Sequence, residues 1–324
     1  MIVAALALTA AQIDAVATRA GLAGEVLVAK GDAVLIDKGY GTIAPGGPAR
    51  HRAGARWRLA SITKQITAAM LIRKARAGGI ALDAPLGPVL HQDALGALTA
   101  RQLLQHHSGL ANPDETRAGA DGVPAFYKAA TPNYPYCFSK PAAPGSPFSY
   151  NNCDYLIASK LLGGSKDQGR RWPAGMAMAK SGEMGVPGYV GGKPEPHYEL
   201  ASFGAAGGLM GTAKAVFAFD RGLMTHRTID AAGLAELWKS EGGRSYQAVG
   251  QWVFPGQLKG CAAPKRIVQR DGEIGGVQTR NYILPDDDLV VVVFTNRSSD
   301  DFPIGEIWQG KGFAYDLLSA VACG

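Results

Sequence analysis

Two polar side chains within residues 57–65 have the types and the spacing that acyl transfer needs. Ser61 and Lys64 lie three residues apart, so on a helix both would project from one face. A serine hydroxyl is a weak nucleophile until a base accepts its proton, and a partly desolvated lysine amine can be that base. A helix beginning at Ser61 would add free N–H groups and partial positive charge beside the hydroxyl. This spacing also arises by chance about once in a chain of this length, so the pair needs support from elsewhere.

A second group of polar side chains, at residues 150–152, could serve the same chemistry. Tyr150 and Asn152 form the only Y-x-N in the chain, and Ser61 and Lys64 form the only S-x-x-K. A tyrosine hydroxyl or phenolate can carry a proton near a serine, and an asparagine amide can hydrogen-bond a substrate amide. The same residues also fit a plain helix start, with Asn152 as the cap and Tyr150 as a packing residue.

The order of these motifs resembles the serine β-lactamase and penicillin-binding-protein superfamily, specifically its class C β-lactamase-like branch. That branch also contains DD-peptidases, D-aminopeptidases and esterases. Its pattern is S-x-x-K on a helix after the first hairpin, followed by Y-x-N in a helical domain. Residues 103–110 are similar to its L-L-x-H-x-S-G-L, and residues 207–209 match its G-G-L. The resemblance covers about residues 13–320 of the chain.

The third motif of that branch, a basic residue followed two positions later by glycine on a late strand, has two registers here. Counting back from Pro285, as the resemblance directs, gives Arg270 and Gly272 as substrate-binding residues, which we prefer. The other register puts Glu273 where a cation is expected. Arginine can bind a carboxylate through two hydrogen bonds, but Asp271 and Glu273 add negative charge. We expect this charge to compete for Arg270, which predicts hydrolysis of small esters or amides with weak or no activity on common penicillins.

The resemblance implies a serine hydrolase that works through an acyl-enzyme on Ser61. Lys64 and Tyr150 would move the proton from Ser61 to the leaving group, and Asn152 would hold the acyl side chain. The backbone N–H groups of Ser61 and Glu273 would form the oxyanion hole. Water would then release the product. The reaction requires no metal or organic cofactor, and its substrate would be a small molecule or a short peptide.

Two other interpretations of the chain remain to be weighed against this one. A non-catalytic binding or regulatory relative could keep the fold, although retention of both motifs argues against it. An α/β-hydrolase is disfavoured because the chain has no G-x-S-x-G. The adjacent His106 and His107 cannot both face one metal ion on a helix, so we interpret them as structural or surface residues. The sequence does not define the oligomeric state.

The elements that must position these residues are strands at both ends of the chain and helices between them. Apolar patterns predict strands at 25–30, 33–41, 246–254, 266–270, 278–284 and 289–295. Apolar periodicity and capping residues predict helices at 13–21, 61–72, 99–109, 154–162, 213–224 and 304–321. We therefore expect an α/β plus all-α fold, in which an antiparallel sheet flanked by helices is built from both chain termini. The α/β domain would comprise residues 1–80 and 240–324, with a helical domain, residues 81–239, inserted.

The composition is typical of a globular protein. The 324 residues are 47% hydrophobic and 19% charged, with a net charge of +6 at pH 7. Basic residues are scattered apart from a cluster within residues 50–58, so we expect no nucleic-acid partner. Residues 1–11 are apolar but too few to span a bilayer, and we expect no integral membrane segment. They resemble a secretory signal that lacks a basic start, or they begin the first helix.

The four cysteines form no C-x-x-C, which argues against a zinc ribbon. An even count together with a signal-like segment permits disulfides, and buried free thiols are the alternative. If disulfides form, we expect Cys137–Cys153, which would bracket the loop that delivers Tyr150, and Cys261–Cys323. On this basis we expect a periplasmic or secreted protein.

Overall fold

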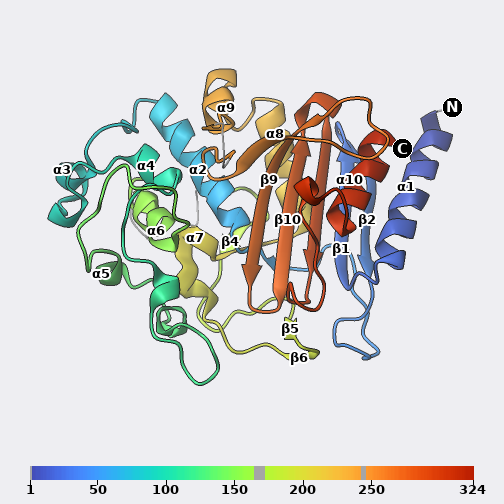
Figure 1. Ribbon diagram of the computed structural model, residues 1–324, viewed down its shortest axis with the longest axis horizontal. Coiled ribbons are helices and arrows are strands. Elements are labelled where there is room, and N and C mark those ends of the chain that lie inside the picture. The colour runs from blue at the N-terminus through green and yellow to red at the C-terminus, as the bar shows by residue number, and fades with distance from the viewer. Residues whose placement is uncertain (1, 164–171, 242–245) are drawn as a thin grey trace.

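A computed structural model describes residues 2–163, 172–241 and 246–324 and is built around one large antiparallel sheet. Within these residues the sheet has six strands in the order β2-β1-β11-β10-β9-β8 (Figure 1). The strands are β1 (Gly24–Lys30), β2 (Ala33–Tyr40), β8 (Trp252–Gly256), β9 (Lys265–Ile274), β10 (Val277–Leu284) and β11 (Leu289–Thr295). Strands from both ends of the chain share this sheet, as predicted, because β1 pairs with β11 and places Gly24 opposite Thr295.

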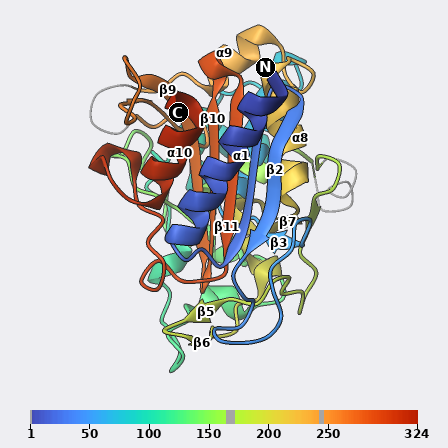
Figure 2. The same ribbon diagram turned by 90° about the vertical axis from the view of Figure 1, so that its right-hand side faces the viewer.

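Helices cover both faces of the large sheet. The helices on one face are α2 (Ile62–Arg76) and α8 (Ala213–Met224), and those on the other are α1 (Ile2–Arg19) and α10 (Phe313–Cys323). Figure 2 looks onto α1 and α10, which lie across the sheet. All seven residues of β11 are buried, with Val292 in the core on the α2 side and Val293 in the core on the α1 side. A strand covered on both faces carries a continuous apolar run rather than an alternating one, which explains its sequence.

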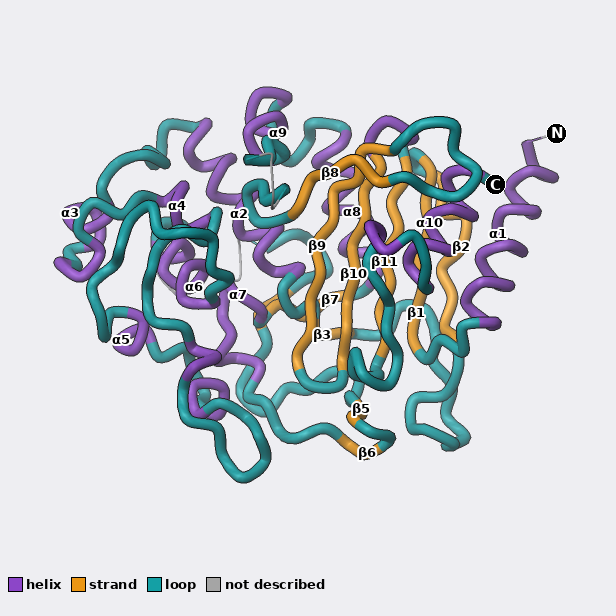
Figure 3. The backbone as a smooth tube through the Cα atoms, in the orientation of Figure 1, coloured by secondary structure: helices purple, strands orange, loops and turns teal. Residues whose placement is uncertain are grey.

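Short helices and long loops form the rest of the molecule, and most of these helices lie to the left of the large sheet in Figure 3. The helices are α3 (Leu86–Leu90), α4 (Ala100–Leu104), α5 (Tyr134–Cys137), α6 (Asn152–Lys160), α7 (Gly204–Gly207) and α9 (Ala231–Leu237). Short strands form two small sheets, β3 (Trp57–Arg58), β7 (Leu209–Gly211) and β4 (Ala177–Met178) in one, and β5 (Tyr189–Val190) with β6 (Lys193–Pro194) in the other. The domain boundaries near residues 80 and 240 stay a prediction.

Several helix boundaries differ from those the sequence predicts. The helix predicted at 99–109 ends at Leu104, and His106 then adopts a positive φ of 63° that no α-helix allows. The helix predicted at 304–321 begins only at Phe313, because the positive φ angles of Gly310 and Gly312 do not allow a continuous helix before it. The strand predicted at 246–254 begins at Trp252. The first helix includes the apolar segment from Ile2 onward, while residue 1 lies outside the described part of the chain.

Both expected disulfides are present. Cys137–Cys153 joins α5 to the first turn of α6, with Cα atoms 5.4 Å apart, and Cys261–Cys323 joins the loop before β9 to the end of α10, with Cα atoms 5.0 Å apart. The described residues include no free cysteine. Within the same ranges, no helix has the length and apolar character needed to cross a bilayer.

Candidate active site

Ser61 lies where the chain turns from β3 into α2. Ala60, the residue before it, has a φ of 46°, a left-handed conformation that costs an alanine on the order of 1 kcal/mol. Ser61 itself is the N-cap of α2 and uses no side-chain cap hydrogen bond, so its hydroxyl is free for other partners. Its N–H has no acceptor among the described residues. The turn therefore presents a hydroxyl and an unpaired N–H at the positive end of a helix, as predicted.

The structure brings the side chains of the first two motifs into one hydrogen-bond network. Ser61 Oγ lies 2.6 Å from Tyr150 Oη, and Lys64 Nζ donates to Ser61 Oγ at 3.0 Å. Lys64 Nζ also donates to Asn152 Oδ1 at 2.6 Å and to the carbonyl oxygen of Ala206 at 2.8 Å. Two groups that can accept a proton therefore lie within hydrogen-bond distance of one hydroxyl, as general-base catalysis requires.

The Lys64 amine is completely buried beneath this network. Loss of hydration lowers its pKa to about 8, because burial disfavours the charged form. The Arg270 guanidinium lowers the pKa further, while Tyr150 acts in the opposite direction. A substantial fraction of Lys64 is therefore neutral and able to accept a proton near pH 8.

Tyr150 is the second candidate base. Burial by itself would raise the pKa of the Tyr150 phenol, but the positive charges of Arg270 and Lys64 outweigh this effect and the pKa is lowered. Arg270 Nη2 donates to Tyr150 Oη at 2.5 Å, and the guanidinium lies 5.3 Å from the centre of the tyrosine ring. These contacts stabilise the phenolate, and the proton of Ser61 can pass to either group.

Arg270, the preferred third-motif residue, acts on the other site residues rather than pointing into open space. Its side chain is 1% exposed. Besides its bond to Tyr150, it donates from Nε to the carbonyl oxygen of Ser61 at 2.9 Å and packs 4.8 Å from the ring centre of Trp252. Gly272, two residues along β9, lies so close to Ser61 that a Cβ atom at this position would be 2.7 Å from the Ser61 backbone nitrogen.

The acidic neighbours of Arg270 do not compete for it, so that part of our expectation is wrong. Successive residues of a strand point to opposite faces, and the Asp271 carboxylate lies 3.3 Å from Arg280 Nε instead. The Glu273 carboxylate accepts a hydrogen bond from the Ser299 N–H at 3.1 Å. Arg270 itself is buried and bonded to Tyr150 Oη.

A cavity of about 290 Å³ opens in front of Ser61. Its lining includes Tyr150, Asn152 and Glu273, together with two residues that no sequence motif identified, Asp114 and Tyr127. Whether the N–H of Glu273 helps to form an oxyanion hole stays a prediction. Asp114 and Tyr127 come from residues 111–149, where the absence of periodicity left no signal to find them by.

Asn152 is engaged at both ends of its amide within the protein. Its oxygen accepts from Lys64, and its nitrogen donates to Tyr127 Oη at 2.7 Å and to Asp114 Oδ1 at 3.4 Å. The Tyr127 hydroxyl in turn donates to Asp114, and its ring stacks on Phe203 with centroids 4.0 Å apart. Asn152 therefore links Lys64 to the wall of the cavity that Tyr127 and Asp114 form.

His106 supports Tyr150 from behind. Its ring lies 4.6 Å from the Tyr150 ring, and its Nδ1 lies 2.8 Å from Asp154 Oδ2. Burial lowers the pKa of His106 well below its ordinary value and raises that of Asp154 well above its own, so the histidine is neutral. His107 bonds separately to Glu241. Among the described residues, no group of three His, Cys, Asp or Glu side chains is placed to hold a metal ion.

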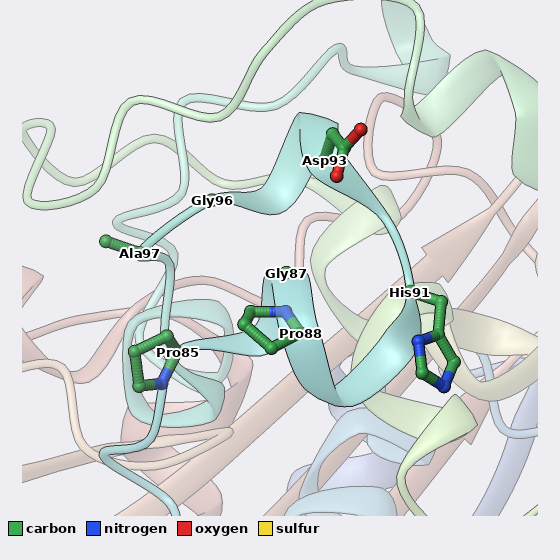
Figure 4. A pocket seen from close by; sticks show the side chains of 7 residues that line it. All are labelled: Pro85, Gly87, Pro88, His91, Asp93, Gly96 and Ala97. Atoms are coloured by element: carbon green, nitrogen blue, oxygen red, sulfur yellow. The ribbon is translucent and has the colours of Figure 1, made fainter.

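A larger cavity of about 570 Å³ lies beside α3, shown in Figure 4. Its lining consists mainly of proline, glycine and alanine, with His91 and Asp93 as its titratable side chains. It shares no lining residue with the cavity at Ser61 and includes no serine or lysine. It therefore has no nucleophile of the kind found at Ser61.

This fold is that of the serine β-lactamase and penicillin-binding-protein superfamily. The chain belongs to the Beta-lactamase family, whose model matches residues 9–309. No protein among the curated sequences matches the chain. Family membership supports hydrolase activity of the serine type without defining the reaction.

Solved structures agree on the fold. A D-amino acid amidase from Ochrobactrum anthropi SV3, complexed with D-phenylalanine, is 14% identical with a TM-score of 0.74, and the match covers 97% of this chain and 98% of that one. A D-stereospecific amidohydrolase from Streptomyces sp. is 20% identical with a TM-score of 0.69 and covers 98% of each chain. A penicillin-binding protein from Bacillus halodurans is 19% identical with a TM-score of 0.68, covering 95% of this chain and 98% of that one.

Proposed function

We propose that the protein is a serine hydrolase that forms an acyl-enzyme on Ser61 from small ester or amide substrates. The observation that carries the proposal is the pair of contacts to Ser61 Oγ, 2.6 Å from Tyr150 Oη and 3.0 Å from Lys64 Nζ. Both partners are groups whose pKa is lowered by their surroundings. A protein that only binds ligands gains nothing from a desolvated lysine beside a free hydroxyl, which disfavours the non-catalytic alternative.

In the first step, Ser61 Oγ bonds to the substrate carbonyl carbon and its proton passes to Lys64 or Tyr150. The resulting oxyanion is stabilised by the backbone N–H groups of Ser61 and Glu273. The base then returns the proton to the leaving oxygen or nitrogen as the bond to the carbonyl carbon breaks. Water attacks the acyl-Ser61 ester by the same route in reverse, and the acid product leaves.

The substrates, in this proposal, carry a free amino group next to the reacting carbonyl, as amino acid amides and esters do. Asp114 places a carboxylate at the wall of the cavity, where it would attract an ammonium group. Tyr127 and Phe203 form an apolar stack beside it that suits an aromatic or aliphatic side chain. Arg270, which would otherwise favour a carboxylate, is buried against Tyr150.

Labelling with a fluorophosphonate probe tests the acyl-enzyme. We expect labelling of the wild-type protein, none in Ser61→Ala, and strongly slowed labelling in Lys64→Ala. Thermal unfolding of each variant serves as the control for folding. Equal labelling of Ser61→Ala, or no labelling of a folded wild type, would show that Ser61 is not the nucleophile.

Matched substrates test the preference for an amino group. We expect phenylalanine amide and p-nitrophenyl acetate to be hydrolysed, and N-acetylphenylalanine amide and benzylpenicillin to react weakly. Asp114→Asn should reduce kcat/KM for phenylalanine amide by roughly ten- to a hundredfold, the range for losing one charge-assisted hydrogen bond. The same variant should leave the acetate ester nearly unaffected. Efficient turnover of benzylpenicillin with negligible ester hydrolysis would point to a β-lactamase.

We also propose that the protein is periplasmic or secreted. The two disulfides support this, because such bonds persist in oxidising compartments. Thiol labelling of protein from fractionated cells, before and after reduction, provides the test. Four reactive thiols before reduction would contradict export.

A further inference from the structure

The two faces of β9 lead to two different places in the molecule. Arg270 and Gly272 face Ser61, whereas Gln269 and Asp271 point to the opposite side of the sheet, as strand geometry requires. There they line a cavity of about 660 Å³ that shares no lining residue with the cavity at Ser61. This second cavity is not used by the proposed reaction.

Aromatic side chains form most of the wall of this second cavity. Trp252 and Phe254 come from β8, Tyr246 comes from the segment before β8, and Trp308 comes from the turn at Ile307–Gln309. Trp308 is 73% exposed and Tyr246 is 40% exposed, so both present ring surface to solvent. None of the described residues that line the cavity is basic. A large exposed tryptophan beside an aromatic hollow has no evident role in packing.

The floor of the second cavity carries excess negative charge. Asp271 and Glu306 share a single guanidinium, because Arg280 Nε lies 3.3 Å from Asp271 and Arg280 Nη2 lies 3.7 Å from Glu306. Gln269 Nε2 donates to both carboxylates, at 2.9 Å and 3.0 Å. Burial and the charge of Asp271 raise the pKa of Glu306, and a cation in the space above the two carboxylates would stabilise the charged form of both.

An unpaired acceptor at the same place indicates what the cation should carry. The Gln269 side chain is 3% exposed, and its Oε1 has no hydrogen-bond partner among the described residues. A buried amide oxygen without a donor is costly, and a ligand N–H would satisfy it. The site thus combines aromatic faces, carboxylates and one free acceptor.

We propose that this second cavity binds a primary alkylammonium or arylalkylammonium ion. The ammonium group donates to Gln269 Oε1 and is stabilised by Asp271 and Glu306, while the organic part packs on the rings of Trp252 and Trp308. The proposal does not depend on the chemistry at Ser61.

Calorimetric titration of the full-length Ser61→Ala protein with 2-phenylethylamine tests the proposal. We expect saturable binding in the millimolar range or tighter, and binding of the uncharged 2-phenylethanol to be at least roughly tenfold weaker. Trp308→Ala should weaken binding of the amine by roughly three- to tenfold, the range for losing one contact between aromatic rings, and Trp308→Phe should restore part of it. The exposure of Trp308 means that its removal should leave the unfolding temperature unchanged.

A matched variant separates this cavity from the one at Ser61. Asp114→Asn should leave binding at the second cavity intact, because Asp114 lines only the cavity at Ser61. Absence of saturable binding, equal binding of the alcohol, or loss of binding in Asp114→Asn with none in Trp308→Ala would each overturn the proposal. Tighter binding of glucose than of 2-phenylethylamine would also overturn it, because the aromatic wall would then be a carbohydrate-binding surface.

Discussion

Replacing Arg270 by glutamine should shift the pH dependence of the reaction rather than abolish the reaction. The guanidinium lowers the pKa of both candidate bases, Tyr150 and Lys64. Its removal therefore raises the pKa of whichever group accepts the proton from Ser61. The prediction is the same for both routes.

The size of the shift follows from the distance between the charges. Arg270 Nη2 lies 2.5 Å from Tyr150 Oη. An opposite charge this close typically lowers a pKa by roughly 1–3 units, and each unit corresponds to about 1.4 kcal/mol. A base must be unprotonated to act, so below its pKa the rate falls about tenfold for each unit by which that pKa rises. The loss should be largest near neutral pH and should shrink at high pH, where the base is unprotonated in both proteins.

The assay is the pH profile of kcat/KM for an amide substrate, measured for wild type, Arg270→Gln and Arg270→Lys. We expect the acidic limb of Arg270→Gln to move upward by roughly 1–3 units, and that of Arg270→Lys to move by less than about one unit because the charge is kept. Superimposable limbs for wild type and Arg270→Gln would refute the role assigned to Arg270. A decrease of kcat/KM by the same factor at every pH would refute it too, because that result would mean that the substitution disturbs the positions of the site residues and not the pKa of the base.

Three further variants test the supports of the site. Cys153→Ser should lower the free energy of unfolding by about 3 kcal/mol and also reduce kcat, because the opened bridge is next to the segment that carries Tyr150. Cys323→Ser should lower the free energy of unfolding by about 4 kcal/mol and leave kcat nearly unchanged, because its bridge packs on the α1 and α10 side of the sheet, opposite α2. Urea unfolding and steady-state kinetics on both variants distinguish these outcomes, and equal kcat values would contradict them. Gly272→Ala should reduce fluorophosphonate labelling by at least roughly a hundredfold, because the added methyl group would lie 2.7 Å from the Ser61 nitrogen; normal labelling would disprove close packing.

The sequence predicts the large sheet well because its strands carry strong local signals. Residues 289–295 form a continuous apolar run, and this stretch is the fully buried β11. The helix 213–224 is reproduced to the residue, because Thr212 caps it through the N–H of Ala215. Helix ends set by positive φ angles were less predictable. His106 follows the end of a helix and has a left-handed conformation. Glycine is typical of such a position and would have indicated the helix end in the sequence, whereas histidine does not.

The site shows the same division between local and long-range information. Ser61 and Lys64 could be identified because a helix makes their spacing meaningful. Asp114 and Tyr127 could not, because they reach Asn152 only through the folding of a segment without periodicity. The direction of Glu273 also had to come from the structure, where Ser299 on a neighbouring loop binds its carboxylate.

The pairing of β1 with β11 has a consequence for how the chain folds during synthesis. Gly24 leaves the ribosome well before its partner Thr295, which lies about 270 residues further along the chain. Contacts between residues so far apart in sequence slow folding, because the intervening loop must close before the contact can form. The contact of Arg270 with Ser61 also cannot form until β9 has been made. We therefore expect nascent chains that are released before β9 to have neither a complete sheet nor a reactive serine.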